Sequence, residues 1–134
     1  MRKKFQIGNG VVRLSVCNIR TKPQHSAELA TQAIMGTPVR ILKKQDDWLL
    51  FRPDRYIGWV DNAGISTMTS IEYHNWMSKK KLISINRGGF IRISENDDSQ
   101  IVSDLVLGSI VAIIKHSYDN KHWKIILPMA EKDM

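Results

Sequence analysis

Cysteine and histidine are the residues in this sequence that could carry nucleophilic chemistry. Cys17 is the only cysteine, and His25 is the histidine nearest to it along the chain. A thiol becomes a nucleophile when a histidine takes its proton, so this pair is one hypothesis for a catalytic centre. Cys17 lies within a strand-like stretch, however, where a lone thiol is typical of a small buried hydrophobic residue. We therefore interpret Cys17 as a core residue and predict no catalytic residue in this chain.

The four histidines do not form a metal-binding motif. His116 and His122 flank a polar turn, and no cysteine pair accompanies them. We predict neither a metal ion nor a cofactor. A single cysteine also forms no internal disulfide bond, so it does not indicate a cellular compartment.

Three aromatic residues and one acidic residue are the candidates for ligand binding. Trp48, Tyr56 and Trp59 could offer stacking surfaces to peptides or sugars, or they could pack in a core. We favour core packing for the two tryptophans and binding for Tyr56, which follows a polar turn. Glu28 could accept a charge-assisted hydrogen bond from a ligand amine, or it could be an ordinary surface charge.

These candidates belong to a sequence that repeats itself at an interval of 72 residues. Ile19-Arg20 corresponds to Ile91-Arg92, and Gly36 corresponds to Gly108, since 91 − 19 and 108 − 36 are both 72. The segments between them align without a gap. Such a repeat indicates one folding unit that is used twice. Because Arg20 recurs as Arg92, we expect a structural role for it rather than the binding of a ligand carboxylate.

Short strands separated by turn residues are expected in both copies. The strand-like stretch at 11–16 and the turns at 36–38 and 45–47 fit a small β-barrel. Segments 82–85 and 90–93 are expected to pair as a hairpin. Between the copies, Thr69 or Ser70 could cap a helix that ends near three consecutive lysines.

The sequence therefore predicts an all-β fold of two small barrels joined by a short helix. We call residues 1–67 the first half, residues 68–81 the linker helix and residues 82–134 the second half. Trp48 and Pro53 in the first half correspond to Trp123 and Pro128 in the second. The first half continues with a Gly-Trp strand at 58–59, and the second has no counterpart. We expect the second barrel to lack this closing strand, and an unpaired strand edge invites pairing.

Charge is unevenly distributed between the halves. The net charge is +7, of which residues 1–66 carry +6 (eleven basic, five acidic) and residues 67–134 carry +1 (nine basic, eight acidic). A basic surface suits an anionic partner, but basic residues interleaved with clustered aromatics are missing, so nucleic acid is not the expected partner. No apolar run reaches the ~20 residues of a membrane span. The basic start at 1–4 is not followed by the apolar core of a signal peptide.

The residues of the first half resemble bacterial SH3 domains. The similarity lies in Asn18-Ile19-Arg20, in His25-Ser26-Ala27-Glu28-Leu29, at Trp48, and in Asp54-x-Tyr56-x-Gly58-Trp59-Val60. The closest resemblance is to the paired SH3 domains that precede the catalytic domain of NlpC/P60 cysteine peptidases, which cut cell-wall peptides between D-glutamate and a diamino acid. The resemblance implies two SH3-like barrels. It also implies a first barrel that walls off the end of the substrate where a free L-alanine amine is recognised, with Tyr56 near the substrate.

We predict a non-catalytic recognition module for bacterial cell-wall (peptidoglycan) peptides, with Glu28, Tyr56, Trp48 and Trp59 as binding candidates. The alternative is the N-terminal, substrate-restricting part of an NlpC/P60 γ-D-glutamyl-diamino acid endopeptidase whose catalytic domain lies outside this chain. The expected partners are a muropeptide and, in the alternative, a catalytic peptidase domain. The resemblance implies a location in the cell envelope.

Overall fold

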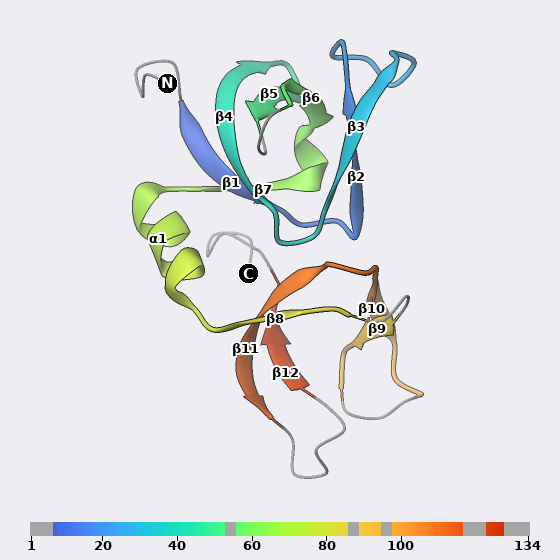
Figure 1. Ribbon diagram of the computed structural model, residues 1–134, viewed down its shortest axis with the longest axis vertical. Helices are drawn as coiled ribbons and strands as arrows, with labels where there is room; N and C mark the ends of the chain where they lie inside the picture. Colours follow the sequence, from blue (N-terminus) through green and yellow to red (C-terminus); the bar gives the residue numbers. More distant parts are fainter. Residues whose placement is uncertain (1–6, 53–55, 86–88, 95–97, 117–122, 128–134) are drawn as a thin grey trace.

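The computed structural model describes residues 7–52, 56–85, 89–94, 98–116 and 123–127 (Figure 1). The expected turns at 54–55 and 86–88, the basic start at 1–4, His122 and the segment 128–134 lie outside the described residues. The described part consists mainly of β-strands with one α-helix, which confirms the β-rich prediction.

The first half forms one antiparallel sheet of seven strands. They are β1 (Gly8–Val12), β2 (Val16–Arg20), β3 (Leu29–Ile34), β4 (Pro38–Gln45), β5 (Trp48–Arg52), β6 (Gly58–Asp61) and β7 (Ile65–Met68). Their order in the sheet is β3-β2-β6-β5-β4-β1-β7, and a short 3-10 helix, η2 (Asn62–Gly64), joins β6 to β7. Edge strands β3 and β7 are not hydrogen-bonded to each other, so the sheet curls around its core without closing into a continuous barrel.

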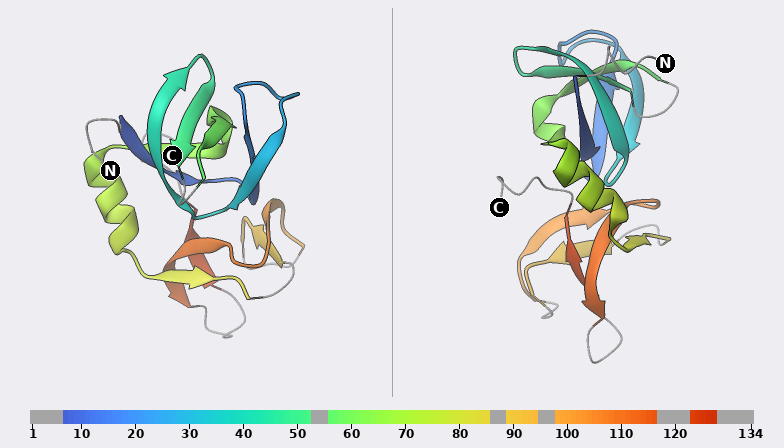
Figure 2. Two further views of the ribbon diagram at one scale, coloured as in Figure 1. Left: turned by 45° about the horizontal axis from the view of Figure 1, so that its top comes forward. Right: turned by 90° about the vertical axis from the view of Figure 1, so that its left-hand side faces the viewer.

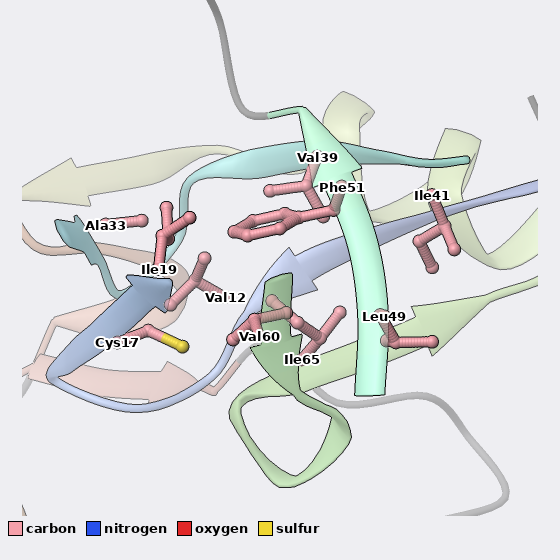
Figure 3. Packing of buried hydrophobic residues seen from close by; sticks show 10 residues of the cluster. All are labelled: Val12, Cys17, Ile19, Ala33, Val39, Ile41, Leu49, Phe51, Val60 and Ile65. Atoms are coloured by element: carbon pink, nitrogen blue, oxygen red, sulfur yellow. The ribbon is translucent and has the colours of Figure 1, made fainter. Parts of the chain in front are cut away.

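Alternating side chains of these strands fill the core of the first half. The burial patterns of β5 and β6 alternate between buried and half-buried residues, as expected when one face of a sheet is covered. Phe51 and Ile19 are both fully buried, and Phe51 lies near the middle of the cluster (Figure 3). The cluster consists of Val12, Cys17, Ile19, Ala33, Val39, Ile41, Leu49, Phe51, Val60 and Ile65.

The expectation of one continuous strand at 11–16 is wrong. β1 ends at Val12, and β2 begins at Val16. Val12 pairs with Ile65 of β7, whereas Val16 pairs with Ile34 of β3. Because these partners lie at opposite edges of the curled sheet, the chain must bend between the two strands.

Helix α1 (Ser70–Ser78) links the two halves (Figure 2). Thr69 is its N-cap, as predicted: the Thr69 hydroxyl accepts a hydrogen bond from the Glu72 backbone N–H, and the Glu72 carboxylate accepts one from the Thr69 N–H. This capping box satisfies two backbone donors that the helix leaves free. At the other end, the Lys81 ammonium donates to the Met77 carbonyl at 3.1 Å.

Within the described residues, the second half contains five strands in two sheets. They are β8 (Lys81–Ile83), β9 (Gly89–Arg92), β10 (Ile101–Leu105), β11 (Ile110–His116) and β12 (Trp123–Ile126). β9 pairs with β10, whereas β11 lies between β8 and β12. The expected hairpin of 82–85 with 90–93 is therefore wrong. Pairing between strands that are distant in sequence overrides the local turn signal, because it places Val111 and Ile91 in a buried cluster.

The strand pairing repeats at the interval seen in the sequence. β2 pairs with β3 through Cys17↔Ala33 and Ile19↔Thr31, and β9 pairs with β10 through Gly89↔Leu105 and Ile91↔Ser103, each residue being displaced by 72. Gly36 and Gly108 also have equivalent positive φ angles of 91° and 92°. The predicted duplication is thus present in the backbone.

One predicted correspondence is displaced by a residue. β4 pairs with β5 through Lys44↔Leu49, and β11 pairs with β12 through His116↔Trp123. Since 116 − 44 is 72, Trp123 occupies the position of Leu49 rather than that of Trp48. Six residues connect His116 to Trp123, against four between Lys44 and Leu49, so the second connection is two residues longer. The alignment of the two tryptophans, 75 positions apart, assumes three extra residues and therefore gives the wrong register.

Two buried clusters join the halves. Val11, Met68 and Trp76 pack with Ala112 of the second half. Met35 of the first half packs with Ile91 and Val111. The Ile110 N–H also donates to the Met35 carbonyl at 2.9 Å, which connects the backbones of the two halves directly.

Candidate ligand-binding site

Trp48 and Asp61 are directly opposite each other on β5 and β6. Directly opposite residues place their side chains on the same face of a sheet. Trp48 follows a tight turn in which Asp46 has a φ of 54°, and the Asn62 N–H donates to the Asp47 carbonyl at 2.8 Å. Both side chains are half-buried, so this pair lies at the surface of the sheet rather than in the core.

The loop between β2 and β3 brings a third side chain to this pair. The Arg20 guanidinium donates to the Ala27 carbonyl at 3.0 Å, and the Thr21 N–H donates to the Glu28 carbonyl at 2.9 Å, so the base of the loop is held closed. His25 on this loop lies with its ring centroid 4.8 Å from the Trp48 ring, at an angle of 60°. His25 Nε2 is also 3.3 Å from Asp61 Oδ2, which is an ion pair when the histidine is protonated.

A surface cavity of about 240 Å³ lies beside these three residues. Leu14, Val16, Cys17, Asn18, Arg20, His25, Trp48, Val60, Asp61, Ala63 and Gly64 line it. The cavity combines an apolar floor with one carboxylate, one guanidinium and two aromatic rings. Such a lining suits a small amphipathic ligand that carries an ammonium group, because a carboxylate and aromatic faces both attract cations.

Asp61 is fixed in place by the backbone around it. Its Oδ1 atom accepts a hydrogen bond from the Ala63 N–H at 3.0 Å, as the N-cap of η2. Its side chain remains 40% exposed, and its other oxygen faces His25. The carboxylate is therefore both oriented by the protein and accessible to a ligand.

Cys17 contributes to the floor of the cavity but not to chemistry. The residue is 3% exposed, and burial, together with the negative charge of Asp61, raises the pKa of its thiol to about 11. The nucleophilic form of cysteine is the thiolate, so this thiol is unreactive near neutral pH. The interpretation of Cys17 as a core residue is confirmed.

The other candidates occupy different positions. Trp59 is half-buried on β6, opposite Leu50 and Arg20, and shares a face with Asp61 because the two are two positions apart on the strand. The expectation of core packing for Trp48 and Trp59 is wrong, since neither belongs to the buried cluster. Tyr56 is 59% exposed, and Glu28 is exposed. Within the described residues, neither of these two lines the cavity.

Asp61 was not among the candidates predicted from the sequence, and His25 was considered only as a partner of Cys17. The signal for Asp61 was its position before Asn62-Ala63-Gly64, a sequence typical of an aspartate that caps a turn. Among the described residues, no group of three or more histidine, cysteine, aspartate or glutamate side chains is arranged to bind a metal ion. Nor does this part of the chain contain a helix long and apolar enough to cross a membrane.

Comparison with known proteins agrees with the fold. Residues 19–65 match the family model described as the bacterial dipeptidyl-peptidase SH3 domain. No curated protein sequence gives a significant match. The chain resembles bacterial SH3 domains and, in its fold, proteins of the NlpC/P60 family, which confirms the resemblance expected from the sequence.

Two solved structures illustrate this similarity. An NlpC/P60 endopeptidase from Photobacterium damselae subsp. piscicida is 14% identical with a TM-score of 0.66, over 96% of this chain and 33% of that protein. An NlpC/P60 family protein from Bacillus cereus ATCC 10987 is 13% identical with a TM-score of 0.70, over 90% of this chain and 51% of that protein. The chain thus spans about a third and about half of these two proteins. At these identities, the similarity shows a shared fold.

Proposed function

We propose that the first half is a non-catalytic recognition module for bacterial cell-wall peptides. The observation that supports this most directly is the cavity formed by His25, Trp48 and Asp61 within the region that matches an SH3 domain. A free N-terminal ammonium of the peptide would bind the Asp61 carboxylate. The peptide backbone would then lie against the rings of Trp48 and His25.

Glu28, Tyr56 and Trp59 would extend this site. Trp59 shares the outer face of β6 with Asp61, so a ligand longer than the cavity would cross it. Tyr56 would supply ring surface and a hydroxyl group, and Glu28 a second carboxylate for the ammonium. The positive charge of the first half also suits a peptide that carries the carboxylates of D-glutamate and a diamino acid.

Isothermal titration with the tripeptide L-alanyl-γ-D-glutamyl-meso-diaminopimelate tests this function. We expect saturable binding, and we expect N-acetylation of the alanine to abolish it because the ammonium is lost. Asp61→Asn should weaken binding roughly 10- to 100-fold, since a hydrogen bond to a charged group contributes about 1.5–3 kcal/mol. Asparagine can still cap η2, so the fold should be kept.

Asp104→Asn provides the matched control. Asp104 is exposed on β10 of the second half, and its substitution changes the net charge by the same amount. The affinity of the Asp104→Asn variant for the tripeptide should equal that of the unmodified protein. The absence of binding at millimolar tripeptide, with the fold intact by circular dichroism, would refute the recognition function.

A second candidate function follows from the length of the similar structures. Both are NlpC/P60 proteins, and this chain spans only part of each. In this alternative, the chain is the substrate-restricting N-terminal part of a γ-D-glutamyl-diamino acid endopeptidase. Sequencing the natural gene tests it: the reading frame should continue past Met134 into a domain with a Cys-His pair, and a natural stop codon there would exclude it. Both candidates place the protein in the cell envelope, which fractionation of the source cells would test.

A further inference from the structure

The two oxygens of the Asp61 carboxylate have different neighbours. Oδ1 accepts a hydrogen bond from the Ala63 N–H at 3.0 Å, which holds the carboxylate at the start of η2. Oδ2 is 3.3 Å from Nε2 of His25, and both of these residues line the cavity. A ligand ammonium that binds this carboxylate from the cavity therefore meets His25 beside it.

His25 makes the two contacts that a bound cation would make. Its Nε2 atom faces a carboxylate oxygen, and its ring centroid is 4.8 Å from that of Trp48. A carboxylate and an aromatic face are also the groups that attract a ligand ammonium. The protonated ring of His25 is therefore an internal substitute for that ammonium. Because the side chain is 75% exposed, it exchanges its proton directly with water.

Histidine is the residue type around this cavity whose charge changes near neutral pH. Arg20 on β2 lines the same cavity, and arginine keeps its proton. The thiol of Cys17 in the cavity floor also keeps its proton, because its pKa is about 11. Lysine stays protonated and carboxylates stay ionised between about pH 5.5 and 7.0. On the neighbouring segments, these two types are represented by Lys22 and Glu28 in the loop of His25 and by Asp46 and Asp47 in the turn before Trp48.

We propose that His25 gates the Asp61 site according to pH: the imidazolium blocks the carboxylate in mild acid, and the neutral ring leaves it open to a ligand ammonium. This inference rests on the proposed recognition function and adds the regulation of its site. The neutral ring still offers the peptide a surface next to Trp48. Ligand affinity is therefore lowest where His25 carries its charge.

Proton binding and ligand binding oppose each other in this arrangement. The ligand ammonium and the imidazolium are like charges at one carboxylate, so each weakens the binding of the other by the same factor. Affinity should therefore rise with pH, and binding in mild acid should release the proton of His25 to the buffer. Because the groups are exposed to solvent, which screens them, we expect a change in affinity of roughly 5- to 10-fold between pH 5.5 and 7.0.

Isothermal titration of the tripeptide into the full chain at pH 5.5, 6.0 and 7.0 tests the gate. The terminal ammonium and the carboxylates of the tripeptide stay largely charged between about pH 5.5 and 7.0, so the ligand itself changes little. Titrations in two buffers with different enthalpies of ionisation detect a released proton as a difference in heat. We expect the tightest binding at pH 7.0 and proton release on binding at pH 6.0.

Variants of two histidines separate the gate from other effects of pH. His25→Phe keeps a ring beside Trp48 but takes up no proton, so its affinity should be the same at all three pH values. His25→Gln also removes the charge and should behave in the same way. His74→Gln is the matched control, because His74 is exposed on α1 and does not line the cavity. This control should keep the pH dependence of the unmodified protein.

The outcomes distinguish the gate from the recognition function. Equal affinity of the unmodified protein at all three pH values would overturn the gate and leave recognition of the tripeptide standing. A rise in affinity with pH that persists in both His25 variants would also overturn the gate, because another group would then be responsible. Absence of binding at every pH would refute the recognition function itself, and the gate with it.

Discussion

Arg20 and Arg92 donate the same hydrogen bond in the two halves. Arg20 Nη1 donates to the Ala27 carbonyl at 3.0 Å, and Arg92 Nη1 donates to the Ser99 carbonyl at 2.8 Å. Ala27 and Ser99 are themselves 72 positions apart. The guanidinium therefore holds the base of a loop in each copy, which confirms the structural role expected from the repeat.

Arg20→Lys is predicted to lower both stability and ligand affinity. Lysine has a shorter reach and a different geometry, so the hydrogen bond to Ala27 should be lost at a cost of about 1 kcal/mol. Since the same loop carries His25, a looser loop should also weaken binding of the tripeptide. Denaturant unfolding and isothermal titration measure the two effects.

Arg92→Lys is the matched control for this prediction. It should destabilise the protein by a similar amount and leave the affinity unchanged, because its loop is in the other half. If both variants weaken binding equally, the loop of the first half has no special part in recognition.

Tyr56 variants are predicted to affect binding rather than folding. The side chain is 59% exposed, so Tyr56→Ala should change stability by no more than about 0.5 kcal/mol. Tyr56→Phe removes only the hydroxyl and should cost about 1 kcal/mol in affinity, with a larger loss for alanine. Melting curves and titrations of both variants provide the test. A large fall in melting temperature with unchanged affinity in the folded fraction would refute a role for Tyr56 in binding.

Gly36→Ala is predicted to be strongly destabilising. Gly36 has a φ of 91°, and a Cβ atom there would overlap the backbone of Ile110 in the second half. The strain and the overlap together should cost about 2–4 kcal/mol of unfolding free energy. Gly89→Ala is the control, since its nearest neighbours would be atoms of Leu105 at 4.0 Å. Equal stability of the two variants in urea would contradict the close contact between the halves.

The raised pKa of the Cys17 thiol predicts that the protein loses stability at alkaline pH. The pKa of the buried thiol is about 11, against 9.0 for an ordinary thiol. Below pH 9 the thiol keeps its proton in both the folded and the unfolded state, so its contribution to the free energy of unfolding is fully present. Between pH 9 and 11 the unfolded state releases its proton first, so the free energy of unfolding should fall by about 2–3 kcal/mol.

The Cys17→Ala variant isolates this effect from other groups that titrate in the same range. Its unfolding free energy should decline less steeply between pH 9 and 11 than that of the unmodified protein. The thiol should also react with Ellman's reagent at pH 8 only when the protein unfolds. Rapid reaction of the folded protein would contradict the burial of Cys17.

The duplicated fold was predictable from the sequence because its strongest signals are local. Gly36 and Gly108 mark turns that require a positive φ, and Thr69 with Glu72 is a typical capping box. The pairing of β8 was not predictable in this way. A glycine-rich segment at 86–89 favours a local hairpin of β8 with β9, whereas the structure pairs β8 with β11, which is distant in sequence.

The candidate site was only partly predictable for the same reason. Trp48 was recognised by its residue type, but its neighbours His25 and Asp61 are separated from each other by 36 positions. The pairing of β5 with β6 and the closed loop after β2 bring them together. No spacing rule encodes such a juxtaposition, since it depends on the complete sheet.

The hydrogen bond between Ile110 and Met35 has a consequence for how the protein is made. All seven strands of the first sheet are encoded before residue 69, so this sheet can form on the ribosome while later residues are still being added. Met35, which directly follows β3, then still lacks its contact with Val111, and Val11 of β1 lacks its contact with Ala112, because both partners come some forty residues later. The nascent first half therefore exposes apolar side chains that favour aggregation. Packing of β11 against them completes their burial.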